Sequence, residues 1–172
     1  TGKTTSGAGT VTITTLDAGS ELANIATTTV NVAATENITL TGTLPDATAA
    51  HITTVTGGKT LQISAAKANG RKIQGTGTVA VTDGDDTTAA DLSNITGTAA
   101  TYACANGTSI TGNLPAADDV QIKNNMTLGG AILTTGKDYE VPTGVTLTST
   151  AANITGKTTS GAGTVTITTL DA

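Results

Sequence analysis

This chain of 172 residues opens with the stretch TGKTTSGAGTVTITTLDA, which recurs letter for letter as residues 155–172. Residue 1 thus corresponds to residue 155, an offset of 154. Because a diverging domain does not keep two identical stretches of this length, the chain is interpreted as slightly more than one period of a tandem array. Repeats in such arrays contact mainly their neighbours, so an elongated stack of similar units is the architecture to test first.

A second and more divergent repetition lies inside the period. Residues 22–47 align without gaps to residues 92–117, and ten of the 26 positions are identical; these are named the X-type units. Residues 60–82 align in the same way to 146–168, and these are named the Y-type units. The order along the chain is therefore X, Y, X, Y, which indicates a duplicated half-repeat.

The two half-repeats differ in length. The offset between the X-type units is 70 and that between the Y-type units is 86, so the second half is longer by 16 positions, within 118–145 as against 48–59 in the first half. The predicted organisation is one full period over 1–154 and the start of the next identical period over 155–172. Within the period we expect the end of a Y-type unit to about residue 18, X-type 22–47, Y-type 60–82, X-type 92–117, a longer spacer 118–145, and the start of the next Y-type unit over 146–154.

The composition limits both the core and the partners. Phe and Trp are absent, Tyr occurs twice, and Thr fills 43 positions. A core without large aromatic residues must be thin and built from Val, Ile, Leu, Ala and Thr methyl groups. The net charge of -5 argues against a nucleic-acid partner, which requires clustered Lys and Arg. No apolar run is long enough to cross a bilayer, so no membrane-spanning segment is expected.

Short β-branched runs separated by Gly, Asn and Asp predict strands and no long helix. In TVTIT (10–14), Val11 and Ile13 point one way and the threonines the other. Tyr102–Cys104 also has the character of a strand, and the lone Cys104 is expected to be a small buried apolar residue. The other predicted strands are 29–32, 38–41, 59–64, 78–82, 108–111, 120–123, 145–148 and 164–168.

Two all-β architectures fit closely spaced short strands: a parallel β-solenoid, or β-helix, and a string of aromatic-poor β-sandwich domains. A sandwich needs a thick core between its sheets, whereas a solenoid coil has a narrow interior that suits stacked Val, Ile, Leu and Ala. The small-residue composition therefore favours the solenoid. At about 20 to 30 residues per coil, we expect about six coils in each period.

The phrases DLSNITG, ANITG, GAGTVTITTLDA and ITGNLP resemble the Thr/Ala/Gly-rich repeats of very large bacterial surface proteins. Such families include repetitive adhesins, haemagglutinin-like solenoids and cell-surface or S-layer-associated filaments. The resemblance covers essentially the whole chain, but it is compositional. It implies an extracellular or cell-surface, elongated, non-enzymatic array, and no family site residue is carried across.

The candidate metal ligands are Asp83, Asp85 and Asp86, which surround Gly84 in an acidic turn. Carboxylates gathered on a glycine turn are the type of ligand that calcium prefers, so calcium is the one cofactor considered. The alternative is a solvated polar turn. Asp118 and Asp119 form a second, weaker acidic turn.

Catalytic chemistry finds little support in the sequence. His51 is the only histidine, so neither a catalytic triad nor a transition-metal site can be assembled, and we expect His51 on the surface or in a turn. The stretch AANITGKT (151–158) differs from a phosphate-binding loop in having Ala151 at the first glycine position. A strand-like sequence follows it, where such a loop requires a helix, so we expect a turn with an exposed Lys157. The chain is predicted not to be an enzyme.

Asn-X-Thr triplets have two interpretations. One is surface glycosylation in a secreted protein. The other, which we favour, is an Asn turn that enters a Thr-rich strand, with Asn amides bonding along the solenoid. The five triplets begin at Asn37, Asn94, Asn106, Asn125 and Asn153.

The sequence thus predicts a structural repeat of a large extracellular filamentous or stalk protein: a stiff, protease-resistant scaffold at a bacterial cell surface or in an extracellular fibre. Its expected partners are neighbouring repeats of the same chain, with lateral self-assembly into a fibre or sheath as a further hypothesis. The alternative is an adhesion or ice-binding module that uses a Thr-rich face. Tyr102, Ala103, Lys72 and Gln74 interrupt the regular Thr-X-Thr series that ice binding needs.

Overall fold

The structure is a computed structural model that describes residues 5–46, 50–84, 89–130 and 133–170. These residues form an all-β fold with two short helices, α1 (Ala65–Ala68) and α2 (Ala151–Ile154). The strands are β1 Thr5–Ile13, β2 Ile25–Ala34, β3 Ile38–Thr39, β4 His51–Val55, β5 Thr60–Ser64, β6 Ile73–Gly75, β7 Thr78–Gly84, β8 Ala99–Cys104, β9 Thr108–Ile110, β10 Asp119–Ile122, β11 Met126–Leu128, β12 Asp138–Glu140, β13 Thr146–Ser149, β14 Thr158–Ser160 and β15 Thr164–Ile167.

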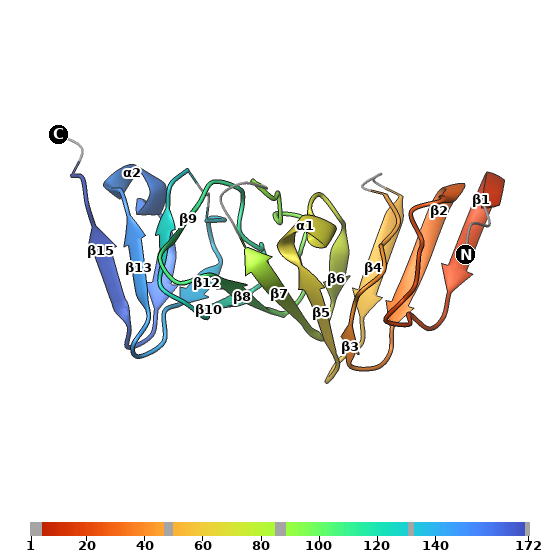
Figure 1. Cartoon of the computed structure of the whole chain (residues 1–172), viewed down its shortest axis with the longest axis horizontal. Coiled ribbons are helices and arrows are strands. Elements are labelled where there is room, and N and C mark those ends of the chain that lie inside the picture. The colour runs from red at the N-terminus through yellow and green to blue at the C-terminus, as the bar shows by residue number, and fades with distance from the viewer. Residues whose placement is uncertain (1–4, 47–49, 85–88, 131–132, 171–172) are drawn as a thin grey trace.

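The chain winds into a parallel β-solenoid, which confirms the predicted fold class and not the sandwich alternative. Figure 1 shows the strands side by side along the long axis, from β1 at the right to β15 at the left. The parallel strands form three sheets, with the orders β1-β2-β4-β6, β14-β12-β10-β8-β7-β5-β3 and β15-β13-β11-β9.

The coils lie at or just below the short end of the length expected from the sequence. Partner positions in successive coils are close along the chain, since Thr60 pairs with Thr78 and Ile38 pairs with Leu61. The chain of 172 residues makes about 8 turns, which corresponds to about seven coils in a period of 154 residues, slightly more than the six expected. Many of the strands are only three or four residues long and are joined by tight corners. One turn of the solenoid therefore needs fewer residues than we had assumed.

The core is a set of side-chain stacks along the solenoid axis. The strands alternate between buried and more exposed positions, as in β8 and β13, because successive side chains point to opposite faces. Parallel pairing without an offset then places each inward residue on its counterpart in the next coil. In the longest sheet this inward stack is Ile38, Leu61, Val79, Ala100, Val120 and Tyr139, each 9% exposed or less.

Each of the nine predicted strand ranges contains a strand, and the prediction for Tyr102–Cys104 is confirmed by β8. Cys104 is buried, also as predicted, and this burial raises the pKa of its thiol. The strands β4, β6, β11, β12 and β14 were missed. Most of these are three residues long, too short for alternation to be recognised.

The two Y-type sequences adopt the same order of elements, β5-α1-β6-β7 and β13-α2-β14-β15. Each short helix begins at a hydroxyl cap: Ser64 Oγ accepts from the amide of Lys67, and Thr150 Oγ1 accepts from the amide of Asn153, both at 3.4 Å. A glycine corner follows the strand after each helix in both copies.

That corner explains why glycine recurs. Gly75 has a φ of +122°, and a Cβ there would lie 2.2 Å from the carbonyl oxygen of Val55 in the preceding coil. The equivalent Gly161 has a φ of +95°, and its Cβ would lie 2.4 Å from the carbonyl oxygen of Val141. Any side chain would therefore separate two coils at this point.

The two X-type sequences also occupy matching environments. Leu22 donates its amide to Thr43, and the equivalent Leu92 donates to Asn113, at 3.1 and 3.0 Å. Each bond joins one coil to the next, so the residues shared by the two copies lie at the same structural positions. The division of the chain into periods stays a prediction.

The longer spacer of the second half adds one coil. Between its X-type and Y-type strands the described part of the first half has β4 alone, whereas that of the second has β10, β11 and β12. As a result, the first half stacks β2-β4-β6 where the second stacks β8-β10-β12-β14. The insertion thus lengthens the stack by one turn and keeps the parallel pairing of the sheets.

The junction at which a Y-type strand meets the next X-type strand is named the Y–X joint. It occurs twice, at β1–β2 and at β7–β8. Val11 faces Val30 in the first joint, and the equivalent Val79 faces Ala100 in the second. The remaining pairs also correspond: Thr10↔Thr29 with Thr78↔Ala99, Thr12↔Asn31 with Ala80↔Thr101, and Ile13↔Val32 with Val81↔Tyr102.

The two joints fill the same space with side chains of different sizes. A Cβ on Gly84 would lie 2.1 Å from the Tyr102 hydroxyl, so the tyrosine uses the space beside the glycine. The equivalent positions in the first joint hold Leu16 and Val32, both buried. A large residue beside a small one in the second joint thus corresponds to two residues of intermediate size in the first.

Candidate functional site

The acidic turn predicted to bind calcium is only partly described by the structure. Asp83 lies near the end of β7 with a φ of 54°, and its Oδ2 accepts from Thr82 Oγ1 at 3.1 Å. It lines a groove of about 350 Å³ together with Lys67, whose positive charge disfavours a cation there. Asp85 and Asp86 lie outside the described residues, so the calcium site stays a prediction.

A second groove, of about 450 Å³, runs over the longest sheet and gathers acidic side chains. Asp119 and Asp138 are direct partners in neighbouring coils, and Glu140 follows two residues later. Two polar side chains hold these carboxylates: Gln121 Nε2 donates to Glu140 Oε2, and Ser160 Oγ donates to Asp138 Oδ2, each at 2.7 Å. The acidic groove forms because the coils stack these residues side by side, and no motif in the sequence contains it.

The chemical capacity of the acidic groove is limited. Within the described ranges, no group of three or more His, Cys, Asp and Glu side chains is arranged to hold a metal ion. Asp138 Oδ1 is buried and has no hydrogen-bond partner among the described residues. The groove therefore presents mainly hydrogen-bond acceptors and negative charge at the surface of the longest sheet.

His51 is not on the surface, and our expectation for it was wrong. It lies in β4 with 5% exposure, and its Nδ1 is 2.6 Å from Asp46 Oδ1. The parallel register places it on the inward stack directly after Val11 and Val30. The alternation in HITTV, with Thr53 and Val55 also buried, was the signal that could have revealed this.

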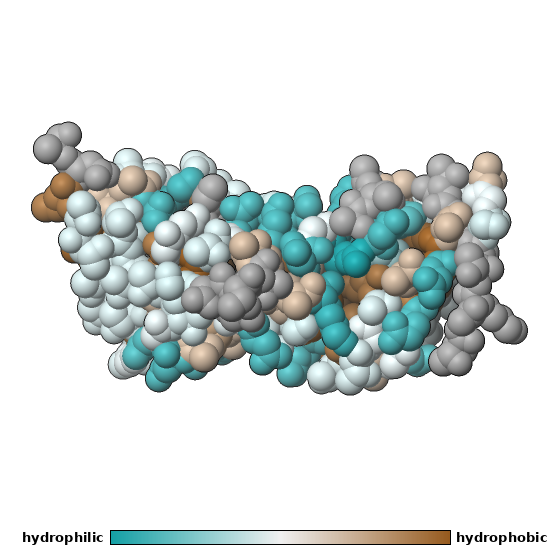
Figure 2. All heavy atoms as spheres, turned by 45° about the horizontal axis from the view of Figure 1, so that its top comes forward, coloured by the Kyte–Doolittle hydropathy of each residue, from teal (hydrophilic) through white to brown (hydrophobic). Residues whose placement is uncertain are grey.

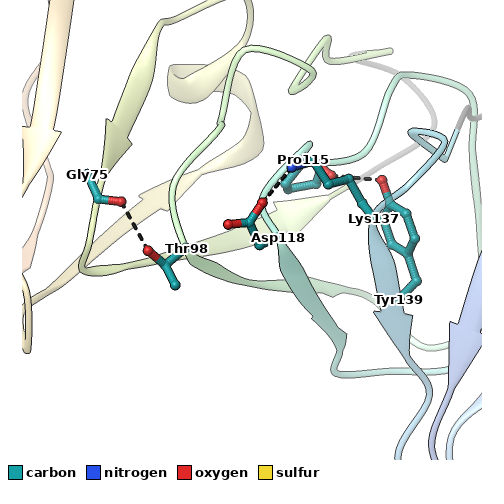
Figure 3. A network of polar contacts seen from close by, with 6 residues as sticks. All are labelled: Gly75, Thr98, Pro115, Asp118, Lys137 and Tyr139. Atoms are coloured by element: carbon teal, nitrogen blue, oxygen red, sulfur yellow. Dashed lines mark hydrogen bonds and ion pairs between the residues drawn. The ribbon is translucent and has the colours of Figure 1, made fainter.

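Tyr139 is the largest fully buried side chain of the described chain and was not singled out from the sequence. Its hydroxyl donates to the carbonyl of Pro115 at 2.9 Å and accepts from the amide of Thr134 at 2.8 Å. Burial raises the pKa of this hydroxyl, so it remains a neutral donor. Figure 3 shows the tyrosine reaching Pro115 beside the ion pair of Lys137 and Asp118, whose atoms are 2.5 Å apart.

Three contacts link successive coils near Tyr139: its bond to Pro115, the Lys137–Asp118 ion pair, and a contact between Thr98 and Gly75. Thr98 Oγ1 lies 3.5 Å from the carbonyl oxygen of Gly75, in the coil before it (Figure 3). The two partners in each of these contacts are about one coil apart along the chain, so all of the contacts fasten one coil to the next. Their role is to hold the stack together.

The asparagines support the structural interpretation of the Asn-X-Thr triplets. Asn106 Oδ1 accepts from the amide of Asn125 at 3.1 Å, and Asn125 Oδ1 accepts from the amide of Thr146 at 2.8 Å. Asn37 does the same for Thr60 at 2.8 Å. Asn153 reaches the preceding coil by donating from Nδ2 to the carbonyl of Leu128. These amides thus bond along the solenoid.

The loop that resembles a phosphate-binding sequence has the wrong geometry for one. The short helix α2 begins at Ala151, and the strands β14 and β15 follow it, as the sequence indicated. Lys157 is half-buried and not exposed, because its Nζ donates to Thr135 Oγ1 at 2.7 Å in the neighbouring coil. A four-residue helix ahead of a strand offers no phosphate cradle.

The outer side of the sheet β9-β11-β13-β15 carries a ladder of hydroxyl side chains. The strand register aligns Ser109, Thr127, Thr148 and Thr166 across four successive coils. A second rank places Thr146 beside Thr164. The sequence interruptions that counted against a regular Thr face lie outside this sheet.

No family model, curated protein or solved structure matches the chain. None of the helices in the described parts of the chain has the length and apolar character needed to cross a membrane.

Proposed function

We propose that this chain is a structural repeat of a large extracellular filamentous or stalk protein. It would provide a stiff, elongated scaffold at a bacterial cell surface or in an extracellular fibre. The location rests on the resemblance of its Thr/Ala/Gly-rich phrases to those of bacterial surface proteins. The scaffold role rests on the arrangement of the coils.

The observation that carries the proposal is the repeated Y–X joint. The joint at β1–β2 and the joint at β7–β8 have the same register, although only some of their residues are the same. A joint whose four central pairs recur in the same register can be added again to extend the stack. Such a unit is suited to building length, because stability then depends on each coil and its nearest neighbours.

The surface and the backbone also suit a scaffold. Most strands in the interior of the described stack pair with strands on both sides, and the edge strands within the stack, β3, β6 and β9, are only two or three residues long. Charged residues make up 12% of the chain, and its eight Lys and Arg residues leave few sites for trypsin-like proteases. These features favour a rod that resists proteolysis and carries few reactive or charged groups.

A series of one to four copies of residues 1–154 tests the proposal. We expect the urea midpoint to rise with copy number and then level off, because the end coils become a smaller fraction of the whole. Solution scattering should show the rod growing by about 35 Å per copy, from about 4.8 Å for each of about seven coils. Constant midpoints, or particles that grow in all dimensions, would contradict a linear scaffold.

A second candidate function is an adhesion or ice-binding face, which is favoured by the hydroxyl ladder of Ser109, Thr127, Thr148 and Thr166. A flat, regular rank of hydroxyl and methyl groups can order the water above it. Thermal hysteresis of the intact chain measures this directly. Replacement of Thr127 and Thr148 by Lys should abolish the effect, whereas the same change at Thr39 and Thr101, on a different sheet, should not.

A further inference from the structure

The sequence contains two Asn-Gly dipeptides, at positions 69–70 and 106–107. Asn-Gly is the asparagine linkage most prone to deamidation, because glycine has no side chain to keep its nitrogen away from the asparagine side-chain carbonyl. Both glycines have a positive φ, +67° at Gly70 and +79° at Gly107, which is a backbone conformation that favours glycine. The fold therefore places a chemically reactive dipeptide at each of these corners.

The coil that follows the first dipeptide holds both of its reactive groups. The amide of Gly70 donates to the carbonyl oxygen of Asp91 at 2.8 Å, and Asn69 Oδ1 accepts from the amide of the same Asp91 at 2.9 Å. One residue of the next coil thus bonds the glycine nitrogen and the asparagine side chain together. We name this pair of bonds an Asn–Gly clamp.

The second dipeptide forms the same clamp with another partner. Gly107 donates its amide to the carbonyl oxygen of Asn125 at 2.7 Å, and Asn106 Oδ1 accepts from the amide of Asn125 at 3.1 Å. The first clamp begins in a Y-type unit and the second in an X-type unit, so their likeness does not follow from the internal duplication. It reflects the same contact between neighbouring coils.

Deamidation needs both of the groups that the clamp holds. The glycine nitrogen loses its proton to solvent and bonds to the asparagine Cγ, and the side-chain amide leaves as ammonia, which gives a cyclic succinimide. Water then opens the ring to give aspartate or isoaspartate. In a closed clamp the proton on the nitrogen is held by the next coil. The side-chain carbonyl cannot turn onto that nitrogen without losing its own hydrogen bond.

Solvent reaches both sites in the folded chain. Asn69, directly after α1, and Asn106 are exposed. Figure 2 shows strongly hydrophilic side chains over the middle of the molecule, in the region where Figure 1 places α1, β7 and β8. Water and a base to remove the glycine proton are therefore at hand. Hydrogen bonding to the next coil, and not burial, is what holds the reaction back.

We propose that Asn69 and Asn106 are modification sites that deamidate only where the coil after them has separated. Proteins open locally at a lower free energy than that of global unfolding, and opening of one joint between coils releases both groups of its clamp. The proposal concerns joints between interior coils and does not depend on the scaffold role.

The two products affect the clamp differently. Aspartate keeps a side-chain oxygen that can accept from the next coil. Isoaspartate carries the main chain through its side-chain carbons, so the backbone is longer by the β-carbon and the acceptor oxygen loses its position. An isoaspartate therefore prevents the clamp from closing again, and it permanently marks a coil that has opened.

Peptide mass spectrometry of the chain in mildly alkaline buffer, either folded or unfolded in guanidinium chloride, tests the proposal. We expect deamidation at Asn69 and Asn106 to be at least tenfold slower in the folded chain. Asn37 is the internal control: its Oδ1 accepts from the amide of Thr60 at 2.8 Å, but Ile38 follows it, so it should react slowly in both states. Equal rates in the folded and unfolded chain at either Asn-Gly site would overturn the proposal.

Two variants loosen the clamps one at a time. Leu92→Ala empties a buried site next to Asp91 in the first clamp, and Met126→Ala does so next to the second; both side chains are 1% exposed. L92A should speed deamidation more at Asn69 than at Asn106, and M126A should do the reverse, each by at least threefold. The same change at both sites in variants that keep their sheet content by circular dichroism would refute local control by the clamp.

Amide hydrogen exchange gives a second readout that needs no variant. Exchange at Gly70 and Gly107 reports the opening of each clamp, because these amides donate to the next coil. In the unaltered chain, guanidinium chloride added below the unfolding transition should raise exchange and deamidation at each site by the same factor. Deamidation that stays constant while exchange rises would overturn the proposal, even if L92A or M126A fails to fold.

Discussion

Leu16 and Leu170 occupy the same place in two identical stretches of sequence, yet Leu16 is 1% exposed and Leu170 is 82% exposed. The backbones differ as well. Residues 5–13 form one continuous strand, whereas the equivalent residues form β14 and β15 with a bend at 161–163 between them. Identical sequence therefore does not fix either burial or local conformation in this fold.

The neighbouring coils explain both differences. The bend after β14 forms where the amide of Gly163 donates to the carbonyl of Val141 in the preceding coil, at 2.8 Å. The described part of the first copy has no preceding coil, so the same glycines stay within a continuous strand. Leu16 is buried because the following coil covers it. The preceding coil thus determines the bend in a coil's backbone, and the following coil determines which of its side chains are buried.

The strongest test of this comparison is to truncate the two equivalent leucines separately. Leu16→Ala should lower the free energy of unfolding by about 2–5 kcal/mol, the usual cost of emptying a buried leucine site. Leu170→Ala should change it by no more than about 0.5 kcal/mol, because that side chain is already in water. Urea unfolding of both variants measures the difference, and equal losses would show that burial is not set by the following coil.

A smaller difference is expected at the glycine corner. Gly161→Ala should cost about 2–3 kcal/mol, because its Cβ would meet the Val141 carbonyl and its φ is positive. Gly7→Ala should cost about 1 kcal/mol, because φ is again positive but nothing lies within 4 Å of the added Cβ. Thermal unfolding of the two variants is the measurement. A larger loss for Gly7→Ala would contradict the role of the preceding coil in shaping the corner.

The smallest expected effect extends the comparison to the X-type units. Asp91 accepts hydrogen bonds from Ser93 Oγ at 2.6 Å and Asn113 Nδ2 at 3.0 Å, and these bonds lower its pKa from the usual value of 3.8. The equivalent Glu21 accepts from Thr43 Oγ1 alone in the described chain. We therefore expect Asp91→Asn to cost about 1 kcal/mol at neutral pH and Glu21→Gln to cost less.

The pH dependence of the Asp91 contribution has a definite sign. Because its pKa is lower in the folded state, the contribution is present above the unfolded value of 3.8 and is lost as the pH falls through the lowered folded pKa. Melting temperatures of the unaltered chain and of Asp91→Asn, measured from neutral pH downward, should converge in that acid range. A gap that persists below it would mean that the Asp91 charge is not responsible.

Part of the fold was predictable from the sequence. The alternation in TVTIT and the absence of Phe and Trp were enough to predict strands with a thin core, and hence a solenoid. The number of coils was not predictable, because it depends on which strands pair, and three-residue strands such as β12 give no periodic signal. Pairing also decided that His51 lies on the inward stack.

The candidate sites were harder to predict for the same reason. Only Asp83 of the predicted calcium ligands lies in the described chain, and Lys67 shares its groove. The acidic groove draws Asp119, Asp138 and Glu140 from two successive coils, so no local motif contains it. The buried Tyr139 was invisible because its two hydrogen-bond partners are set by the winding of the chain.

The winding has a consequence for how the molecule responds to tension. The hydrogen bonds between coils lie along the long axis, so a force applied to the two ends loads them directly. The coil from Thr60 to Thr78 takes up about 4.8 Å of the stack but about 60 Å when pulled straight. The end coil, held on one side only, should yield first, and the rod would then lengthen one coil at a time.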